Sequence, residues 1–297
     1  MADAASRNRL FCFGLGYSAG RLAKALLADG WRAAGTTRTA AGQAQLAAEG
    51  IDAFRFDGDR PMADAARVLA GATHILSSVP PGPGGDPVLA HHGHDIKAVK
   101  TVRWVGYLST TGVYGDTLGA TVTETSDLNP TSERSRQRVE AEEAWLKLAR
   151  DHGLPAHVFR LAGIYGPGRS ALDQVRNGQA RRIDKPDHLF SRIHVDDIGL
   201  VLRASMERPA PGAVYNVCDD QPAAAANVTL FACELLGVLP PDPIPFEEAR
   251  LAMSPMALSF WRDNRRVSNR RIHEELGVRL NYPDYRAGLR AVLAAGG

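Results

Sequence analysis

Several features of specialised protein classes are missing from this sequence. No apolar run is long enough to span a bilayer, and residues 1–8 lack the apolar core of a signal peptide. The net charge of +2 is small, and no dense basic stripe with interleaved aromatic residues indicates a nucleic-acid partner. We therefore expect a cytoplasmic protein with a small-molecule substrate, without a membrane or nucleic-acid partner.

Cysteine and lysine are both scarce. The three cysteines form neither a CxxC pair nor a zinc-ligand spacing, so we expect buried thiols in a reducing compartment. Lysine is confined to Lys24, Lys97, Lys100, Lys147 and Lys185, and all other cations are arginine, as in proteins of GC-rich bacterial genomes. Because arginine does not exchange protons near neutral pH, this bias limits the acid–base chemistry that the cationic side chains can perform.

What the first half does contain is a regular alternation of strand and helix patterns. Strands are expected over residues 10–13, 31–37, 53–56, 73–79, 103–109 and 156–161, and helices over 21–27, 43–49 and 132–152. This alternation predicts an α/β fold with a Rossmann doubly wound parallel sheet. We predict an NAD(P)-binding Rossmann domain over residues 1–162. Residues 163–297 should mainly form a small C-terminal substrate-binding cap, with segments around 193–217 returning to the Rossmann domain.

A glycine-rich turn separates the first expected strand from the first helix. Gly14 permits a tight turn, Gly16 lets the backbone approach a pyrophosphate, and Ala19 allows close packing of the helix. Tyr17 and Ser18 in the same turn are also predicted to bind the cofactor, because the amide groups at the N-terminus of the following helix can bind phosphate oxygens. The pattern GxGxxA, between a strand and a helix, predicts a dinucleotide site.

The tip of the second strand distinguishes between the two nicotinamide cofactors. NAD sites usually place Asp or Glu there, and this sequence has neither. Arg38, helped by Thr36 or Thr37, would instead bind a 2′-phosphate, so we predict NADP as the preferred cofactor, with NAD as the alternative. Otherwise Arg38 is a solvated loop cation.

Two further segments belong to the predicted cofactor site. Asp57, after the third strand, is the candidate for binding the adenine amino group, or else an ordinary turn aspartate. Ser78, Val79 and Pro80, at the end of the fourth strand, are also predicted to contact the cofactor.

The chain resembles an extended short-chain dehydrogenase/reductase of the NAD-dependent epimerase/dehydratase superfamily over most of its length. The segments that carry the resemblance are Ser109–Gly115, Glu124–Pro130, Arg160–Gly168, Ile193–Asp197 and Val214–Val217. The resemblance implies a catalytic Ser or Thr after the fifth strand and a Tyr-x-x-x-Lys pattern on the next helix. Thr110 takes the first role, with Thr111 as its neighbour.

This chain departs from the family pattern at the most important catalytic position. Arg134 stands at the position of the tyrosine and Arg138 at that of the lysine, and the helix contains no tyrosine. In the family the phenol is the acid–base group, and a guanidinium does not replace it near neutral pH. The chain is therefore similar to an atypical subgroup without the active-site tyrosine.

Three chemical alternatives remain open. Tyr114 or Tyr165 acts as the acid, or else these side chains serve packing and substrate contact. A water relayed by Thr110 performs the proton transfer. Arg134 and Arg138 bind an anionic substrate, such as a carboxylate or a sugar-nucleotide phosphate, while Arg138 keeps the ribose contact of the family lysine. Otherwise the two arginines lie on a solvated helix face and pair with nearby glutamates.

The remaining histidines and cations have less specific interpretations. We interpret His91, His92 and His94 as part of a mobile loop and predict no metal site. His194 is expected in the core or behind the site. Trp261, with arginines at positions 262, 265 and 266, forms either a cap surface for an anionic ligand or a solvated helix.

The leading functional hypothesis is an NAD(P)-dependent oxidoreductase or epimerase/dehydratase-like enzyme. The alternative from another class is a catalytically silent NAD(P)-binding redox sensor or regulator. By analogy with the family, a homodimer through the long helix is also expected.

Overall fold

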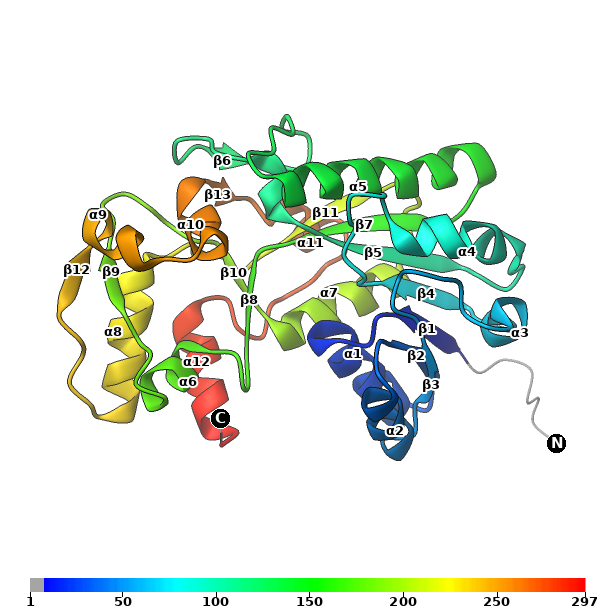
Figure 1. Ribbon diagram of the computed structural model, residues 1–297, viewed down its shortest axis with the longest axis horizontal. Coiled ribbons are helices and arrows are strands. Elements are labelled where there is room, and N and C mark those ends of the chain that lie inside the picture. Colours follow the sequence, from blue (N-terminus) through cyan, green and yellow to red (C-terminus); the bar gives the residue numbers. More distant parts are fainter. Residues whose placement is uncertain (1–7, 297) are drawn as a thin grey trace. The chain divides into compact units, whose positions relative to one another are not determined.

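The computed structural model describes residues 8–296 (Figure 1). The contacts within it divide the chain into two compact units. The first unit comprises Met1–Thr110, Arg136–Arg160 and Gly199–Tyr215, and the second comprises Thr111–Ser135, Leu161–Ile198 and Asn216–Gly297. Residues 111–135 therefore group with the second unit, although they precede the boundary expected at residue 162.

The first unit is built on a seven-stranded sheet in the order β11-β7-β5-β4-β1-β2-β3. The neighbours β1–β2, β1–β4, β2–β3 and β4–β5 pair in parallel. Consecutive parallel strands need crossover helices, which confirms the predicted Rossmann doubly wound sheet. Its strands are β1 (Arg9–Phe13), β2 (Arg32–Thr37), β3 (Asp52–Arg55), β4 (His74–Ser77), β5 (Trp104–Thr110), β7 (Ala156–Leu161) and β11 (Val214–Val217).

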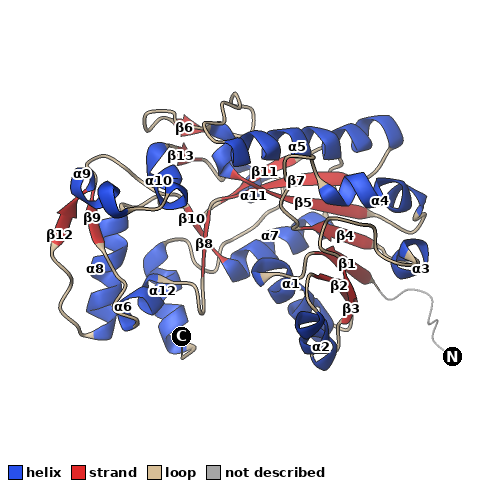
Figure 2. Cartoon of the chain, in the orientation of Figure 1, coloured by secondary structure: helices blue, strands red, loops and turns tan. Residues whose placement is uncertain are grey.

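Helices cover both faces of this sheet (Figures 1 and 2). Helices α3, α4 and α5 lie on one face, where Trp145 and Ile96 pack in one apolar cluster with strand residues such as Tyr107. Helices α1 and α2 lie on the other face together with the end of α7, whose Ser205 accepts a hydrogen bond from Trp104 Nε1 at 3.0 Å. The helices are α1 (Tyr17–Ala28), α2 (Ala40–Ala48), α3 (Ala65–Leu69), α4 (Pro87–Ala98), α5 (Glu133–His152) and α7 (Val195–Glu207).

The segment with His91, His92 and His94 is helical, so its interpretation as a mobile loop is wrong. Asp86 caps α4 by accepting hydrogen bonds from the amides of residues 88 and 89, and Pro87 stands at the first helical position. His92 is fully buried, and its Nε2 accepts a hydrogen bond from the Met62 amide at 3.1 Å. Among residues 8–296, no group of three or more His, Cys, Asp or Glu side chains is arranged to hold a metal ion.

The second unit combines short parallel strand pairs with a helical core. The pairs are β8–β10, β9–β12 and β6–β13, and the core packs Leu172, Phe231 and Leu289 from three helices. The strands are β6 (Thr121–Val122), β8 (Gly163–Tyr165), β9 (Arg182–Asp184), β10 (Arg192–His194), β12 (Pro243–Pro245) and β13 (Arg266–Val267). The helices are α6 (Ala171–Arg176), α8 (Ala225–Leu236), α9 (Phe246–Ala249), α10 (Pro255–Arg262), α11 (Arg270–Glu274) and α12 (Tyr285–Ala294), with 3₁₀ turns η1 (Thr111–Tyr114) and η2 (Arg250–Ala252).

Two expectations from composition can be compared with this fold. Cys12, Cys218 and Cys233 are free and buried, which confirms the prediction of buried thiols. Across the described residues, none of the helices has both the length and the apolar character that a membrane span requires.

Candidate functional site

The predicted dinucleotide turn lies where the strand order of the sheet reverses. Gly14 follows β1, whose neighbours are β2 on one side and β4 on the other. Its amide donates to Thr36 Oγ1 at 2.8 Å, and its carbonyl accepts from Ser78 Oγ at 2.5 Å. Open α/β sheets bind ligands at the carboxyl ends of the strands at such a switch point. The turn therefore occupies the position in the fold where a cofactor site is expected.

Gly14 and Gly16 are needed for different reasons. Gly14 has a φ of +82°, and a Cβ there would lie 2.9 Å from Ser78 Oγ. Gly16 is the N-cap of α1, and a Cβ added to it would meet no atom within 4 Å. The cap makes no side-chain hydrogen bond, and the first turn of α1 carries no acidic residue. The residues present thus fit a pyrophosphate, since open space lies in front of a helix N-terminus.

Small residues bring α1 close to the sheet behind this opening. Ala19 is fully buried, and Tyr17 and Ser18 are half-buried in the first turn of α1. A Cβ on Gly35 would lie 2.4 Å from the Cys12 carbonyl oxygen and 2.7 Å from Leu15 Cδ1. The turn is therefore held by close backbone packing.

The tip of β2 separates the roles of its two threonines. Thr36 is buried and its hydroxyl accepts a hydrogen bond from the Gly14 amide, so Thr37 is the more accessible of the two threonines to a ligand. Thr37 is half-buried, whereas Arg38 is exposed. Within the described part of the chain, the Arg38 side chain has no hydrogen bond or ion pair. Its guanidinium is thus available to a ligand at this tip.

The other predicted cofactor residues differ in their accessibility. Asp57 is exposed, and its Oδ1 accepts a hydrogen bond from the Asp59 amide at 3.2 Å, as in an ordinary turn. Ser78 and Val79 are half-buried beside Gly14, and Pro80 is exposed. The adenine contact of Asp57 stays a prediction.

Thr110 and Thr111 belong to different units. Thr110 is half-buried at the end of β5 and closes a segment of the first unit, whereas Thr111 is buried and opens η1 in the second unit. The role of Thr110 in orienting a reacting oxygen stays a prediction.

Both tyrosines considered as replacement acids are buried in the second unit. The Tyr114 hydroxyl donates to Asn216 Oδ1 at 2.7 Å, and the Tyr165 hydroxyl donates to the Asp284 carbonyl at 3.3 Å. Burial raises the pKa of Tyr165, with a further contribution from nearby carboxylates such as Asp219. These contacts agree with the alternative in which the two tyrosines serve packing. Proton donation to a substrate by either phenol stays a prediction.

The two arginines at the Tyr and Lys positions have different surroundings. Arg134 is exposed in the first turn of α5, within the second unit. Arg138 is half-buried in the first unit, where its Nη1 donates to the Leu108 carbonyl at 2.7 Å and to Tyr107 Oη at 3.2 Å. Its guanidinium carbon lies 5.8 Å from the centre of the Tyr107 ring. Arg138 therefore does not lie on a solvated helix face.

A buried carboxylate lies close to Arg138 in the same unit. Asp86 accepts a hydrogen bond from Trp145 Nε1 at 3.0 Å and caps α4. Burial raises the pKa of Asp86, and the positive charge of Arg138 partly opposes this shift. Asp86 thus links α4 to α5.

Sequence reasoning missed a buried ion pair behind the end of β5. Glu142 on α5 accepts a hydrogen bond from Ser109 Oγ, and its Oε2 accepts from Arg160 Nη2 at 2.8 Å and Nε at 3.1 Å. The Glu142 and Arg160 side chains are 2% and 5% exposed. The network connects α5, β5 and β7 next to Thr110. No local sequence pattern predicts this network, because Ser109, Glu142 and Arg160 are far apart in the sequence.

Comparison with known proteins agrees with this architecture. A family model described as "NAD dependent epimerase/dehydratase family" matches residues 96–218. A solved structure of a functionally unknown conserved protein from Silicibacter pomeroyi is 50% identical, with a TM-score of 0.88, and covers 97% of this chain and 99% of its own. Residues 96–218 thus form an NAD-dependent epimerase/dehydratase domain by this family model.

Two more distant similarities complete this comparison. Protein YeeZ of Escherichia coli is 28% identical over 284 residues, which are 91% of this chain and 95% of YeeZ. The dTDP-glucose 4,6-dehydratase of Bacillus anthracis, solved in complex with NAD, is 15% identical with a TM-score of 0.75. That alignment covers 97% of this chain and 96% of the dehydratase, and at this identity it shows the shared fold.

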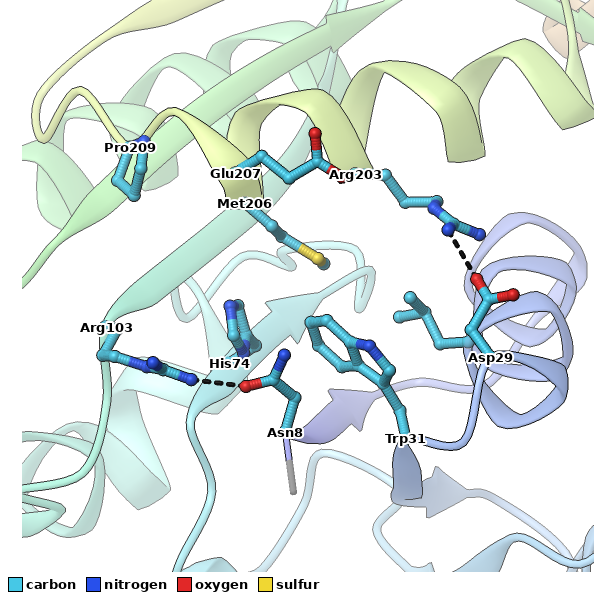
Figure 3. Close-up of a pocket in the computed structure, with 10 residues that line it drawn as sticks. Asn8, Asp29, Trp31, His74, Arg103, Arg203, Met206, Glu207 and Pro209 are labelled. Atoms are coloured by element: carbon cyan, nitrogen blue, oxygen red, sulfur yellow. Dashed lines mark hydrogen bonds and ion pairs between the residues drawn. The ribbon is translucent and has the colours of Figure 1, made fainter. Parts of the chain in front are cut away.

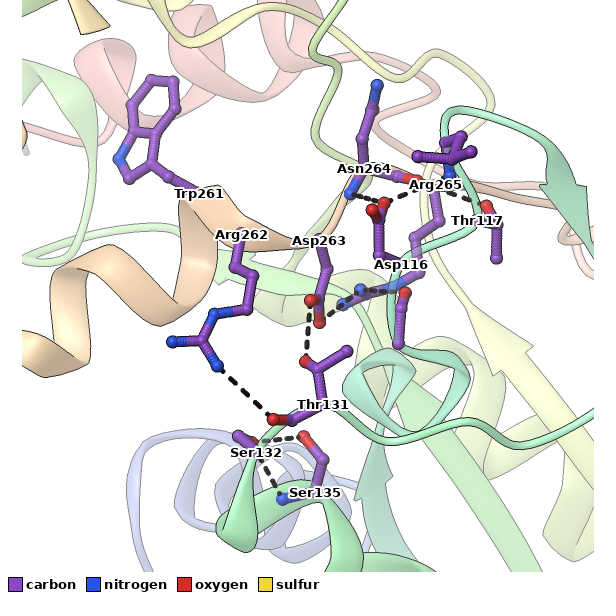
Figure 4. A network of polar contacts seen from close by, with 12 residues as sticks. Asp116, Thr117, Thr131, Ser132, Ser135, Trp261, Arg262, Asp263, Asn264 and Arg265 are labelled. Carbon is purple, nitrogen blue, oxygen red and sulfur yellow. Dashed lines mark hydrogen bonds and ion pairs between the residues drawn. The ribbon is translucent and has the colours of Figure 1, made fainter. Parts of the chain in front are cut away.

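Among the arginines near Trp261, Arg265 is held by internal contacts of the second unit, whereas Arg262 and Arg266 are exposed (Figure 4). Arg265 Nη1 donates to the Gly115 carbonyl at 2.8 Å and to Asp263 Oδ2 at 3.1 Å. Asp263 also accepts a hydrogen bond from Thr131 Oγ1 at 2.7 Å. Arg265 is therefore neither solvated nor free for an anionic ligand, and it joins the segment after β5 to the C-terminal part of the chain.

Proposed function

We propose that this protein is an NADP(H)-dependent oxidoreductase or epimerase/dehydratase-like enzyme that acts on a small anionic substrate. The observation that carries the proposal is the open N-terminus of α1 above Gly16, next to the exposed and unpaired Arg38. The open helix N-terminus suits a pyrophosphate, and the Arg38 guanidinium suits the 2′-phosphate of NADP(H).

The cofactor preference rests on charge at the tip of β2. A carboxylate there would accept from a ribose 2′-hydroxyl and repel a phosphate, and Thr36, Thr37 and Arg38 provide none. A guanidinium forms charge-assisted hydrogen bonds with phosphate oxygens, each stronger than a neutral one. Arg38 therefore favours NADP(H) over NAD(H).

The proposed chemistry distributes roles over the residues around the end of β5. A bound nicotinamide supplies the acceptor or donor of a hydride. Thr110 orients the reacting oxygen and relays a proton through water, since neither guanidinium exchanges one near neutral pH. Arg138, held against Leu108, contacts the ribose, and the exposed Arg134 attracts the anionic part of the substrate.

A second candidate function is a redox sensor that binds NADP(H) without turnover. It is favoured by the absence of a phenol from α5 and by the buried, hydrogen-bonded hydroxyls of Tyr114 and Tyr165. A protein without an acid–base group would still bind the dinucleotide. Its interactions with another molecule would then depend on whether the bound cofactor is oxidised or reduced.

Titration with NADPH and NADH, followed by cofactor fluorescence, tests the cofactor site. We expect Arg38→Ala to weaken NADPH binding at least about tenfold, as for the loss of one charge-assisted hydrogen bond, and to leave NADH binding nearly unchanged. Arg32→Ala is the matched control, because Arg32 is an exposed arginine at the other end of β2. If NADH binds to the wild type as tightly as NADPH, the preference for NADP(H) is refuted. If neither cofactor binds, the dinucleotide site itself is refuted.

A substrate screen with Thr110→Val separates the two functions. An enzyme would oxidise NADPH with some carbonyl substrate, and the variant would lose this turnover while keeping NADPH affinity. NADPH-dependent change of oligomeric state without turnover of any carbonyl would favour the sensor.

A further inference from the structure

A second cavity opens in the first unit at the amino ends of the strands, the edge opposite to the Gly14 turn (Figure 3). Asn8 precedes β1, Trp31 precedes β2, His74 begins β4 and Arg103 precedes β5. Because parallel strands present all their amino ends at one edge, these four residues line the same cavity. Its volume is about 470 Å³, within the range of small-molecule sites.

The cavity has aromatic and apolar walls. The rings of Trp31 and His74 lie 4.7 Å apart at their centres, and Leu26 and Met206 complete the apolar lining. Burial and the charge of Arg103 lower the pKa of His74 to about 4, so its ring is neutral at pH 7. Trp31 is half-buried, which leaves part of the indole available for contact with a planar ligand.

The charges in the cavity are distributed unevenly. Arg203 is paired with Asp29 at 2.5 Å, so its charge is compensated. Arg103 instead donates to the neutral side-chain oxygen of Asn8. Within the described residues no carboxylate forms an ion pair with Arg103, and Figure 3 shows it beside Asn8, at the end of the cavity away from Asp29. Glu207 also lines the cavity, beside Arg203 in Figure 3, so Arg103 is the lining arginine that has no carboxylate partner among the described residues.

We propose that this cavity is a second ligand site, which binds a planar aromatic carboxylate. The aromatic part packs against Trp31 and between Leu26 and Met206, and the carboxylate accepts hydrogen bonds from Arg103. The site is independent of the proposed cofactor site, because none of its residues belongs to the Gly14 turn or the tip of β2.

The probe for this site is 2-naphthoate, with the neutral 2-naphthamide as the matched ligand. We expect saturable binding of 2-naphthoate with a Kd of about 1 mM or tighter, measured by calorimetry, and about fivefold weaker binding of the amide. Arg103→Met should weaken binding of the acid about tenfold and leave that of the amide nearly unchanged. Arg32→Met, an exposed arginine outside the cavity, is the control variant.

Several outcomes would overturn the proposal. The first is equal affinity of the wild type for 2-naphthoate and 2-naphthamide. The second is an affinity of the Arg103→Met variant for 2-naphthoate that equals that of the wild type. The third is the absence of saturable 2-naphthoate binding below about 10 mM. Trp31→Leu provides a second measurement, since it should weaken both ligands by removing the aromatic wall. None of these results depends on NADPH, so failure here and failure at Gly16 and Arg38 are distinguishable.

Discussion

The buried pair of Glu142 and Arg160 allows a quantitative prediction. In Arg160→Met the carboxylate of Glu142, which is 2% exposed in the wild type, loses all its guanidinium hydrogen bonds and keeps the Ser109 hydroxyl as its partner. Removing one member of a buried pair costs about 3–5 kcal/mol, because an uncompensated charge is left in a medium of low polarity. For a chain of this size the loss corresponds to a decrease in melting temperature of about 5–8 °C.

A double variant distinguishes the charge effect from lost packing. Glu142→Leu combined with Arg160→Met leaves no buried charge, so it should melt higher than Arg160→Met alone, and the two changes should be strongly non-additive. Thermal unfolding followed by circular dichroism measures the double variant and the two single variants, Arg160→Met and Glu142→Leu. A double variant that melts at or below the Arg160→Met single variant would refute the reasoning, as would a single variant within about 2 °C of the wild type.

Three shorter predictions concern the same unit. Gly16→Ala should weaken NADPH binding strongly and leave the melting temperature unchanged, because its Cβ meets no protein atom within 4 Å but occupies the space proposed for the pyrophosphate. Gly14→Ala should destabilise the protein more than Gly30→Ala; both have a φ near +80°, but only the Cβ at Gly14 approaches another side chain, at 2.9 Å. Because of His74, the free energy of unfolding should decrease as the pH is lowered from about 6.5 to about 4, by at most about 3 kcal/mol. In this range the unfolded chain takes up a proton at His74, whereas the buried ring in the folded protein has a pKa of about 4 and does not. His74→Asn should abolish this part of the pH dependence, and an unchanged profile in denaturant titrations would contradict the assignment.

Local signals in the sequence were sufficient for the elements around the dinucleotide turn. The strand before Gly14 and the long helix ending at His152 form close to their expected limits, whereas the helix after Gly16 begins four residues before its expected start at residue 21. The error at residues 87–98 had a local remedy, since Asp86 and Pro87 are a standard cap and first residue of a helix.

The surroundings of individual side chains could not be predicted in the same way. The spacing of charges on α5 suggested solvated pairs for Arg138 and Glu142, whereas the structure directs Arg138 to β5 and pairs Glu142 with Arg160. Thr36 and Thr37 are neighbours with the same side chain, yet only Thr36 is buried and bonded to Gly14. Such differences depend on which face of an element meets another element.

The sequence by itself therefore determined the order of strands and helices, the glycine turn and the loss of the family tyrosine, because each depends on residues within one or two turns of the chain. Only the tertiary structure decided that Gly14 meets Thr36 and Ser78, that Glu142 is buried against Arg160, and that a cavity lined by Trp31 and Arg103 opens at the opposite edge of the sheet. These features join residues that are 18 or more positions apart, and their pairing is set by the register and order of the parallel strands.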